Sequence, residues 1–299
     1  LCYINSIMKR SIYDKNTFEN FLKENHCGTK EIRRIRRLLF REFLPVEMVI
    51  QNEILLKNIN DNFHSSFLDI SEIHDSKIDG ATKILFKTHD GHHIETVILR
   101  IESGRTSVCI SSQIGCNEKC TFCATGKIGF IRNLSHDEII DQIVHVGKIL
   151  KKEEKELRNI VFMGMGEAFH NFDNLVQVIN TLTDGATFQF AHKFITVSTL
   201  GLADRLEEFS TLFPSISIAI SLNAPDDLLR ESIMPVNRRF PLESLKRSIM
   251  KIQENRKNPV MIEYIMFRGL NDSENHAAKL SDFLKDLNVH INLIPYNSL

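Results

Sequence analysis

The sequence predicts an α/β protein, with a partial (β/α)6 barrel preceded by a small N-terminal helical domain and a β-hairpin. From Ser107 onward, short β-branched stretches alternate with longer segments of helical periodicity, which is typical of βα units in a parallel sheet. Before that point, two alternating stretches flank Asp90-Gly91, a strong hairpin signal. The first 60 residues show mainly the apolar spacing of helices.

These patterns give the expected positions of the elements. Parallel strands are expected at about residues 107–111, 159–163, 194–198, 215–221, 260–267 and 289–295. The expected organisation is a helical domain over residues 1–60, a linker and hairpin over residues 61–104, and the barrel over residues 105–299.

The N-terminal domain is expected to contain three short helices. The first covers residues 17–25 and the third covers about residues 46–58. In the second helix, Ile32, Ile35 and Leu39 recur near i, i+3 and i+7, so they form one apolar face.

The rest of that second helix is basic. Its positive residues are Lys30, Arg33, Arg34, Arg36, Arg37 and Arg41, against a single acidic residue, Glu31. Such a row is often only a solvated face, but clustered arginines also bind RNA phosphates because they release counterions. Both interpretations stay open here, since the net charge of −1 gives the whole chain no general attraction to polyanions.

Between the helices and the barrel, residues 59–82 are polar and interrupted, which favours a linker. Residues 82–87 and 93–101 then form the expected hairpin. Glu95 lies on its second strand, a position where a glutamate is usually exposed rather than catalytic.

The most informative stretch runs from Cys109 and reads C-I-S-S-Q-I-G-C-N-E-K-C-T-F-C. Within it, Cys116, Cys120 and Cys123 have the spacing C-x3-C-x2-C. Thiolates are the soft ligands that iron–sulfur clusters prefer. Three of them hold three irons of a [4Fe–4S] cluster and leave the fourth iron open to bind a small molecule.

Structural zinc is the competing interpretation of these cysteines. Zinc takes four ligands, commonly in two pairs. No second pair is present, because Cys2 and Cys27 are isolated, and His136 and His145 fall in a later helix. That helix should begin at Ser135 with a capping box.

The composition fits an ordinary globular protein, with 42% hydrophobic and 25% charged residues in 299. No apolar run reaches the roughly 18 residues of a membrane span, and the first residues are too polar for a secretion signal. Clustered free thiols indicate a reducing compartment, with the cytoplasm as the default and an organelle matrix left open.

Ligand-binding groups of a βα barrel lie where the carboxyl ends of its strands meet the following loops. The candidates at such positions are Gly166, Glu167, Ser198, Ser221, Leu222, Asn223 and Asn297. As a bare motif the glycine segment is also typical of a simple turn, and serine and asparagine are common caps at strand ends. The cysteine loop follows the first barrel strand, so a cluster would lie at the same end.

The stretch C-I-S-S-Q-I-G-C-N-E-K-C-T-F-C-A-T-G-K-I-G-F-I-R-N-L-S resembles radical S-adenosylmethionine (SAM) enzymes. It is most similar to the radical SAM adenine methyltransferases of large-subunit ribosomal RNA, the RlmN/Cfr family. The resemblance extends from about Lys30 to the last residue. It implies that the three cysteines hold the cluster, that Gly166 and Glu167 hold the amino end of SAM, and that the other strand-end candidates line its ribose and adenine.

The resemblance also implies a reaction at C2 or C8 of an adenine in ribosomal RNA, with tRNA as a further substrate left open. In the family a C-terminal cysteine takes a methyl group from one SAM. The radical made from a second SAM then abstracts a hydrogen atom from that methyl group. Glu95, in Glu95-Thr96-Val97, would then remove the ring proton, and Cys109 would release the product by forming a disulfide. A donor such as flavodoxin or ferredoxin would reduce the cluster, and a monomer without a membrane partner is expected.

The sequence departs from the family pattern at several positions. Ala168 stands where many members have proline, as in the branch that methylates C8, and Asn223 stands where histidine is usual. The sequence ends at Leu299, directly after the last expected strand, without the run that carries the methyl-accepting cysteine. The alternatives are therefore a radical SAM enzyme acting on a small molecule and an inactive RNA-binding paralogue.

Overall fold

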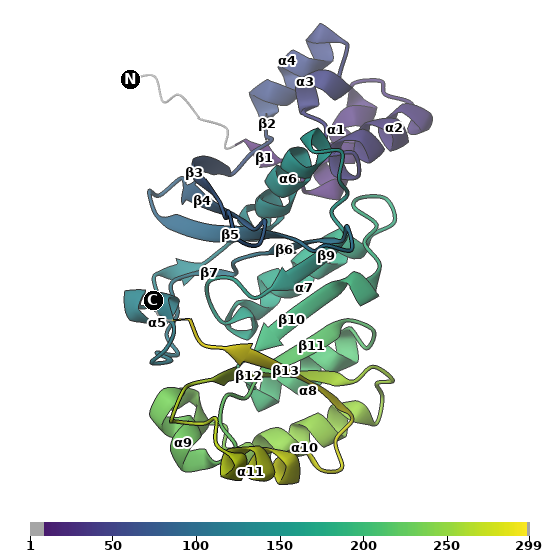
Figure 1. Ribbon diagram of the computed structural model, residues 1–299. Helices are drawn as coiled ribbons and strands as arrows, with labels where there is room; N and C mark the ends of the chain where they lie inside the picture. The colour runs from purple at the N-terminus through teal and green to yellow at the C-terminus, as the bar shows by residue number, and fades with distance from the viewer. Residues whose placement is uncertain (1–8, 298–299) are drawn as a thin grey trace, which may run out of the picture. The chain divides into compact units, whose positions relative to one another are not determined.

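The computed structural model describes residues 9–297 (Figure 1). The chain divides into two compact units. The first consists of Leu1–Val108, Ser135–Arg158 and Val176–Phe190, and the second of Cys109–Leu134, Asn159–Leu175 and Ala191–Leu299.

The first unit begins with helical structure. After the short strand β1 (Arg10–Ser11), its helices are α1 (Lys15–Glu24), α2 (Thr29–Phe40), α3 (Val46–Val49) and α4 (Glu53–Asn62). The apolar face expected on α2 is confirmed, because Ile32, Ile35 and Leu39 are buried. The single helix expected over residues 46–58 is wrong, because the backbone is extended at Ile50 and a new helix begins after Asn52. The Asn52 side chain accepts hydrogen bonds from the first backbone N–H groups of α4, which stabilises this second start.

The expected hairpin is confirmed as β4 (Thr82–Thr88) and β5 (His93–Arg100), which pair antiparallel. The expected linker is wrong in part, because β2 (Phe63–His64) pairs with β1 and β3 (Leu68–Asp75) pairs antiparallel with β4. Only the first residue of β3 is buried. An edge strand with an exposed side-chain row shows no apolar alternation, so its sequence does not reveal it.

Within the first unit, helix α6 (His136–Lys152) contacts both the hairpin, through Thr96, and the N-terminal segment, through Tyr13. It begins with the expected capping box of Ser135 and Glu138. Its buried Asp141 accepts hydrogen bonds from the Tyr13 hydroxyl at 2.5 Å and from the Leu68 N–H at 2.9 Å. Burial raises the pKa of Asp141, but His145 and the hydrogen bonds from Tyr13 and the Phe67 N–H together lower it below its usual value, so the carboxylate stays charged.

The second unit contains five parallel strands, ordered β13-β12-β11-β10-β9. They are β9 (Asn159–Phe162), β10 (Ile195–Thr199), β11 (Ser217–Ser221), β12 (Val260–Met266) and β13 (Val289–Pro295). Together with β6 (Thr106–Cys109), they lie within about two residues of the six expected strands, so the predicted α/β class is confirmed.

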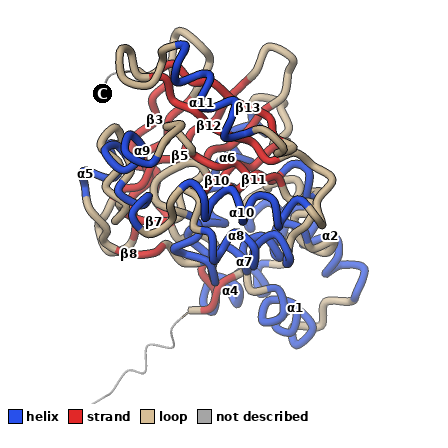
Figure 2. The backbone as a smooth tube through the Cα atoms, turned by 90° about the horizontal axis from the view of Figure 1, so that it is seen from below, coloured by secondary structure: helices blue, strands red, loops and turns tan. Residues whose placement is uncertain are grey.

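Helices follow the parallel strands in sequence (Figures 1 and 2). They are α7 (Phe172–Thr183), α8 (Ala203–Leu212), α9 (Asp227–Ile233), α10 (Leu242–Gln253) and α11 (Glu274–Leu284), with 3₁₀ turns η1 (Ala168–Asn171), η2 (His192–Phe194) and η3 (Pro235–Arg238). Helices α8 and α10 lie side by side. The strand residues Ile218 and Ile262 are fully buried. None of the helices within residues 9–297 is long and apolar enough to cross a membrane.

Candidate functional site

The cysteine loop is closed by a small antiparallel pair of strands. Strand β7 (Gln113–Ile114) precedes the cysteines, and β8 (Arg132–Asn133) returns beside it after the short helix α5 (Ala124–Ile128). The N–H of Cys116 donates to the carbonyl of Gly129 at 3.1 Å. Gly115 has a φ of +74°, and a Cβ there would lie 1.7 Å from that carbonyl oxygen, so only glycine fits. The two arms of the loop are therefore held in contact.

The three thiols of this loop lie in a low-dielectric environment. Cys116 and Cys120 are buried and Cys123 is half-buried. Burial raises the pKa of Cys116 to about 11, and burial together with Cys123 and Cys116 raises the pKa of Cys120 to about 12. Thiolates gathered here need a cationic partner to be stable, so this donor set fits an iron–sulfur cluster.

Among residues 9–297, no three histidine, cysteine, aspartate or glutamate side chains are grouped as ligands of one metal ion. Structural zinc requires such a group, with each sulfur about 2.3 Å from the metal. In a [4Fe–4S] cluster each thiolate binds a different iron, so its sulfurs lie farther apart.

The segment Gly164-Met165-Gly166-Glu167 packs directly against the residues that lead into the cysteine loop. The carbonyl of Met165 accepts hydrogen bonds from the N–H groups of Ser112 and Gln113, at 2.9 and 3.1 Å. Gly166 has a φ of +99°, and a Cβ there would lie 2.5 Å from the Gln113 side chain. The glycine therefore permits this close approach.

The carboxylate of Glu167 is buried at the centre of these loops. It accepts hydrogen bonds from the N–H of Leu200 at 2.8 Å and from the N–H of Phe169 at 3.1 Å. Burial raises the pKa of Glu167 to about 7, despite these bonds. A cationic ligand group would restore its charge.

A second carboxylate gathers the hydroxyl groups at the ends of the next strands. Glu263 Oε2 accepts hydrogen bonds from Ser198 at 2.9 Å and from Ser221 at 3.3 Å. Burial raises the pKa of Cys109 to about 12, and the Glu263 charge adds to this effect. The structure therefore brings Ser198, Ser221 and Cys109 together around Glu263.

Sequence reasoning missed Glu263. A single glutamate within a strand has no motif around it. The usable signal is the parallel register, in which Glu263 stands opposite Ser221. This register was not predictable from the sequence alone.

The remaining strand-end candidates are Asn223, Leu222 and Asn297. Asn223 has a φ of +59° and is buried. Its side chain accepts a hydrogen bond from the Ile265 N–H at 2.9 Å and donates to Met234 Sδ at 3.4 Å, so its amide is engaged within the protein. Leu222 is fully buried, and Asn297 is exposed after β13.

Arg230 is the other residue that the sequence did not single out. Its fully buried guanidinium donates hydrogen bonds to the carbonyls of Leu200 at 2.6 Å and Leu222 at 3.1 Å. It therefore joins the loops after β10 and β11.

Glu95 belongs to the first unit. It is half-buried on β5, and its carboxylate lies 3.1 Å from the Lys83 ammonium group. Cys27, Cys109, Cys116, Cys120 and Cys123 are all free thiols, and Cys2 lies outside the described residues. The expected disulfide of Cys109 is therefore not formed with any described cysteine.

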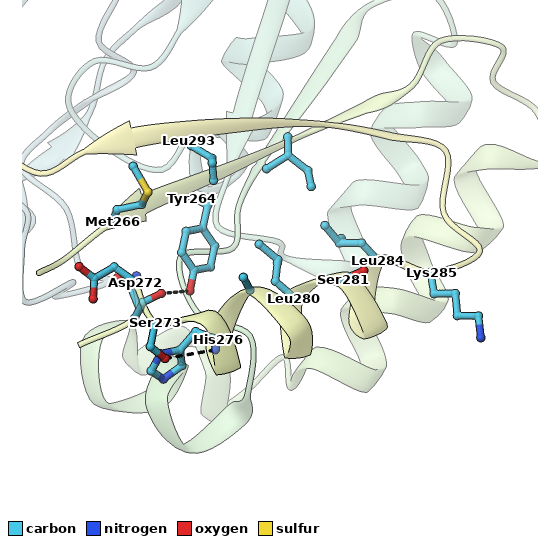
Figure 3. A pocket seen from close by; sticks show the side chains of 13 residues that line it. Tyr264, Met266, Asp272, Ser273, His276, Leu280, Ser281, Leu284, Lys285 and Leu293 are labelled. Carbon is cyan, nitrogen blue, oxygen red and sulfur yellow. Dashed lines mark hydrogen bonds between the residues drawn. The ribbon is translucent and has the colours of Figure 1, made fainter. Parts of the chain in front are cut away.

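A pocket of about 560 Å³ lies between β12, β13 and α11 (Figure 3). Tyr264, Met266, Leu280, Leu284 and Leu293 give it an apolar lining. Side chains of neighbouring strand residues point to opposite faces, so Tyr264 lies on the helix side of β12, while the adjacent Glu263 faces the strand-end site. The pocket is thus separate from the strand-end residues.

Comparison with known proteins defines the class of this site. Residues 110–280 match the radical SAM superfamily. The crystal structure of a radical SAM methyltransferase from Sphaerobacter thermophilus superimposes with a TM-score of 0.89 at 33% identity, over 96% of this chain and 85% of that chain. The superfamily implies a [4Fe–4S] cluster and SAM as cofactors.

Curated relatives narrow the class further. A probable RNA methyltransferase of Rhodopirellula baltica is 41% identical over 96% of this chain and 75% of its own length. The "Dual-specificity RNA methyltransferase RlmN" of Pelobacter propionicus is 38% identical over 86% of this chain and 71% of its own length. The chain belongs to the RlmN family of radical SAM methyltransferases.

Proposed function

We propose that the protein is a radical SAM methyltransferase that acts on a carbon of adenine in RNA. The observation that carries this proposal is the closed loop with three buried or half-buried cysteines, packed against the Gly164–Glu167 segment. The names of its relatives supply the substrate class, RNA. Large-subunit ribosomal RNA is the proposed substrate, with attack at C2 or C8, and tRNA is a second candidate.

Cys116, Cys120 and Cys123 are the residues that would hold the cluster. Bound there, the cluster and SAM supply the 5′-deoxyadenosyl radical that a methyl transfer to an unreactive aromatic carbon needs. A reducing compartment such as the cytoplasm, and an electron donor of the flavodoxin or ferredoxin type, belong to this proposal.

The chain's own residues would bind and orient SAM. Glu167 would hold the ammonium group, whose positive charge favours the ionised form of this buried carboxylate. Ser198 and Ser221, held by Glu263, would hydrogen-bond the ribose. Gly166, whose missing Cβ admits the Gln113 side chain, would present its backbone to the amino end of SAM.

Two residues are assigned to the substrate side. Glu95 would take the proton from the adenine ring as general base. Cys109 would release the product from the methyl-carrying cysteine of the family, with a sulfur–sulfur bond forming as the carbon–sulfur bond to the RNA breaks. Burial raises the pKa of the Cys109 thiol, so a base must first remove its proton. Leu222, Asn223 and Asn297 complete the proposed SAM-binding set, although the Asn223 amide is already engaged.

Only some of the basic side chains of α2 and its C-terminal end are free of the contacts that would keep them from RNA. Arg36 is buried and paired with Glu19, and Arg41 donates to the carbonyl of Thr187 at 3.1 Å. Lys30, Arg33, Arg34 and Arg37 are the exposed cations within the helix, although Arg34 donates to the carbonyl of Val49 at 3.3 Å and Arg37 lies 3.4 Å from Glu42. These four are the ones proposed to contact phosphates.

Anaerobic reconstitution with iron, sulfide and SAM of a protein that also carries the family's C-terminal cysteine run, followed by mass spectrometry of digested RNA, tests the proposal. Conversion of SAM to 5′-deoxyadenosine together with a methylated adenine in the RNA supports it. SAM cleavage that depends on a small molecule and not on RNA favours the alternative radical SAM enzyme. A chain that binds RNA but cleaves no SAM is the inactive paralogue.

A further inference from the structure

The segment between the first two cysteines of the loop carries a buried carboxylate. The Glu118 side chain is only 4% exposed, although its neighbours Asn117 and Lys119 are exposed. Arg239 donates a hydrogen bond to Glu118 Oε1, and His170 Nε2 lies 3.2 Å from the same oxygen. A carboxylate is removed from water only at a large cost unless such partners compensate it. The contact is therefore a built feature of the loop.

The backbone around Glu118 is held at a second point. Lys119 has a φ of +53°, which is uncommon for a residue with a side chain and persists only where surrounding contacts maintain it. The N–H of Thr121 donates to the carbonyl of Ile233 at 3.0 Å. The loop is thus attached to the segment 233–239 on both sides of Cys120.

The charge of Glu118 also lies close to the thiols. Glu118 is two residues away from both Cys116 and Cys120 in the sequence. Net charge near an iron–sulfur cluster is one of the factors that set its reduction potential. A carboxylate makes addition of an electron less favourable, and a guanidinium beside it offsets this effect.

We propose that Glu118 is a positioning residue for the cluster, held in place by Arg239, which also offsets its charge. The inference rests on the proposed function, because it requires the cluster at Cys116, Cys120 and Cys123. The contact between Glu118 and Arg239 is not part of the three-cysteine motif.

The first test is retention of the cluster. Wild type, Glu118→Gln, Arg239→Gln and the control Arg238→Gln are reconstituted anaerobically, and the release of iron to a chelator is timed. The control changes the adjacent arginine, whose partner is the half-exposed Glu231. We expect Glu118→Gln and Arg239→Gln to lose iron roughly tenfold faster than wild type, since hydrogen bonds to charged groups contribute that much. Arg238→Gln should match wild type.

The second test is the reduction potential of the cluster, measured by redox titration followed by electron paramagnetic resonance. Glu118→Gln removes a negative charge and should raise the potential. Arg239→Gln leaves Glu118 without its main cation and should lower it. The double variant should return toward wild type. An ion pair that only stabilised the fold would not produce shifts of opposite sign.

Each outcome decides the proposal. Opposite shifts together with faster iron loss support it. Wild-type iron retention in both variants, or shifts of the same sign, overturns it. A wild-type chain that takes up no iron overturns the proposed function, and the role of Glu118 with it. Circular dichroism of the iron-free variants shows that they fold, and Arg239→Gln, with a half-exposed side chain, is the variant least able to affect folding.

Discussion

Three of the titratable side chains at the strand ends are in environments that oppose their charged forms. Burial raises the pKa of Glu167 to about 7, and it raises the pKa values of Cys109 and Cys120 to about 12. Two of these groups therefore favour a positive partner: an ammonium group for Glu167 and metal for Cys120. Without such a partner, burial disfavours the charged forms of both groups.

This environment predicts a pH dependence of stability that belongs to Glu167. The folded state keeps the proton up to about pH 7, whereas the unfolded chain loses it near the ordinary value of 4.5. Wild type should lose stability as pH rises between these values, by about 3 kcal/mol at roughly 1.4 kcal/mol per pKa unit. Glu167→Gln carries no such titration.

Urea unfolding of the iron-free wild type and of Glu167→Gln from pH 4 to pH 8 measures the effect. The difference between their unfolding free energies should change in favour of the variant across this range. The lost acceptor for Leu200 or Phe169 adds only a pH-independent offset. A difference that stays constant with pH contradicts the account of Glu167.

Glu263 leads to a prediction about SAM affinity. Glu263→Ala removes the acceptor that Ser198 and Ser221 share, so both hydroxyls lose their orientation. We expect the dissociation constant of SAM to rise roughly tenfold, as when a hydrogen bond to a charged group is lost. Glu243→Ala, at a glutamate whose side chain is 78% exposed, is the matched control and should bind SAM like wild type. Isothermal titration calorimetry measures the SAM affinity of both variants, and equal SAM affinities would refute the role of Glu263.

At this scale the sequence identified the residues that belong to a motif. The spacing of Cys116, Cys120 and Cys123 and the segment that ends in Glu167 can be recognised because they are local. Glu263 and Arg230 could not be found, because their partners lie far along the chain, as Ser198 does from Glu263, or are backbone carbonyls. Asn223 was a candidate from the sequence, and its hydrogen bonds to Ile265 and Met234 depend on tertiary structure.

The secondary-structure elements were predictable where burial imposes a period. The buried β10 and β11 and the amphipathic α2 lie close to their expected positions. Strand β3 was missed because almost all of it is exposed, and it is fixed by backbone pairing with β4. The break between α3 and α4 was missed because it depends on the cap at Asn52 rather than on apolar spacing.

Helix α2 allows a prediction at the scale of an element. Arg33→Glu with Arg37→Glu reverses two exposed charges, so RNA affinity should fall. The slope of its salt dependence should also weaken, by about 0.7 to 0.9 for each phosphate that the helix no longer neutralises. Lys148→Glu with Lys152→Glu on α6 is the control with the same change of charge. Binding of an RNA hairpin measured at several salt concentrations tests this. If both double variants bind more weakly and with the same reduced salt dependence, α2 makes no specific interaction with RNA.

For the whole molecule, the order of strands and helices in the sequence predicted the α/β fold class. That class in turn predicted that candidate ligand-binding residues lie at the carboxyl ends of the strands. In the second unit the strand ends bring Ser198, Ser221 and Glu263 together, and Glu167 lies against Gln113, which leads into the cysteine loop. The division into two units was not predictable, because Ser135–Arg158 and Val176–Phe190 group with the N-terminal part of the chain rather than with the strands around them. Such long-range packing is not encoded in any local pattern.

The central claim is that three cysteines bind a cluster with one open iron. The most direct measurement is the iron and sulfide content of anaerobically reconstituted protein, with Mössbauer spectra recorded before and after addition of SAM. The account predicts about four irons and four sulfides per chain, a spectral change of one iron site with SAM, and loss of all iron when Cys116, Cys120 and Cys123 are replaced by alanine. Stoichiometric zinc in the purified protein, or iron retained by the triple variant, would contradict it.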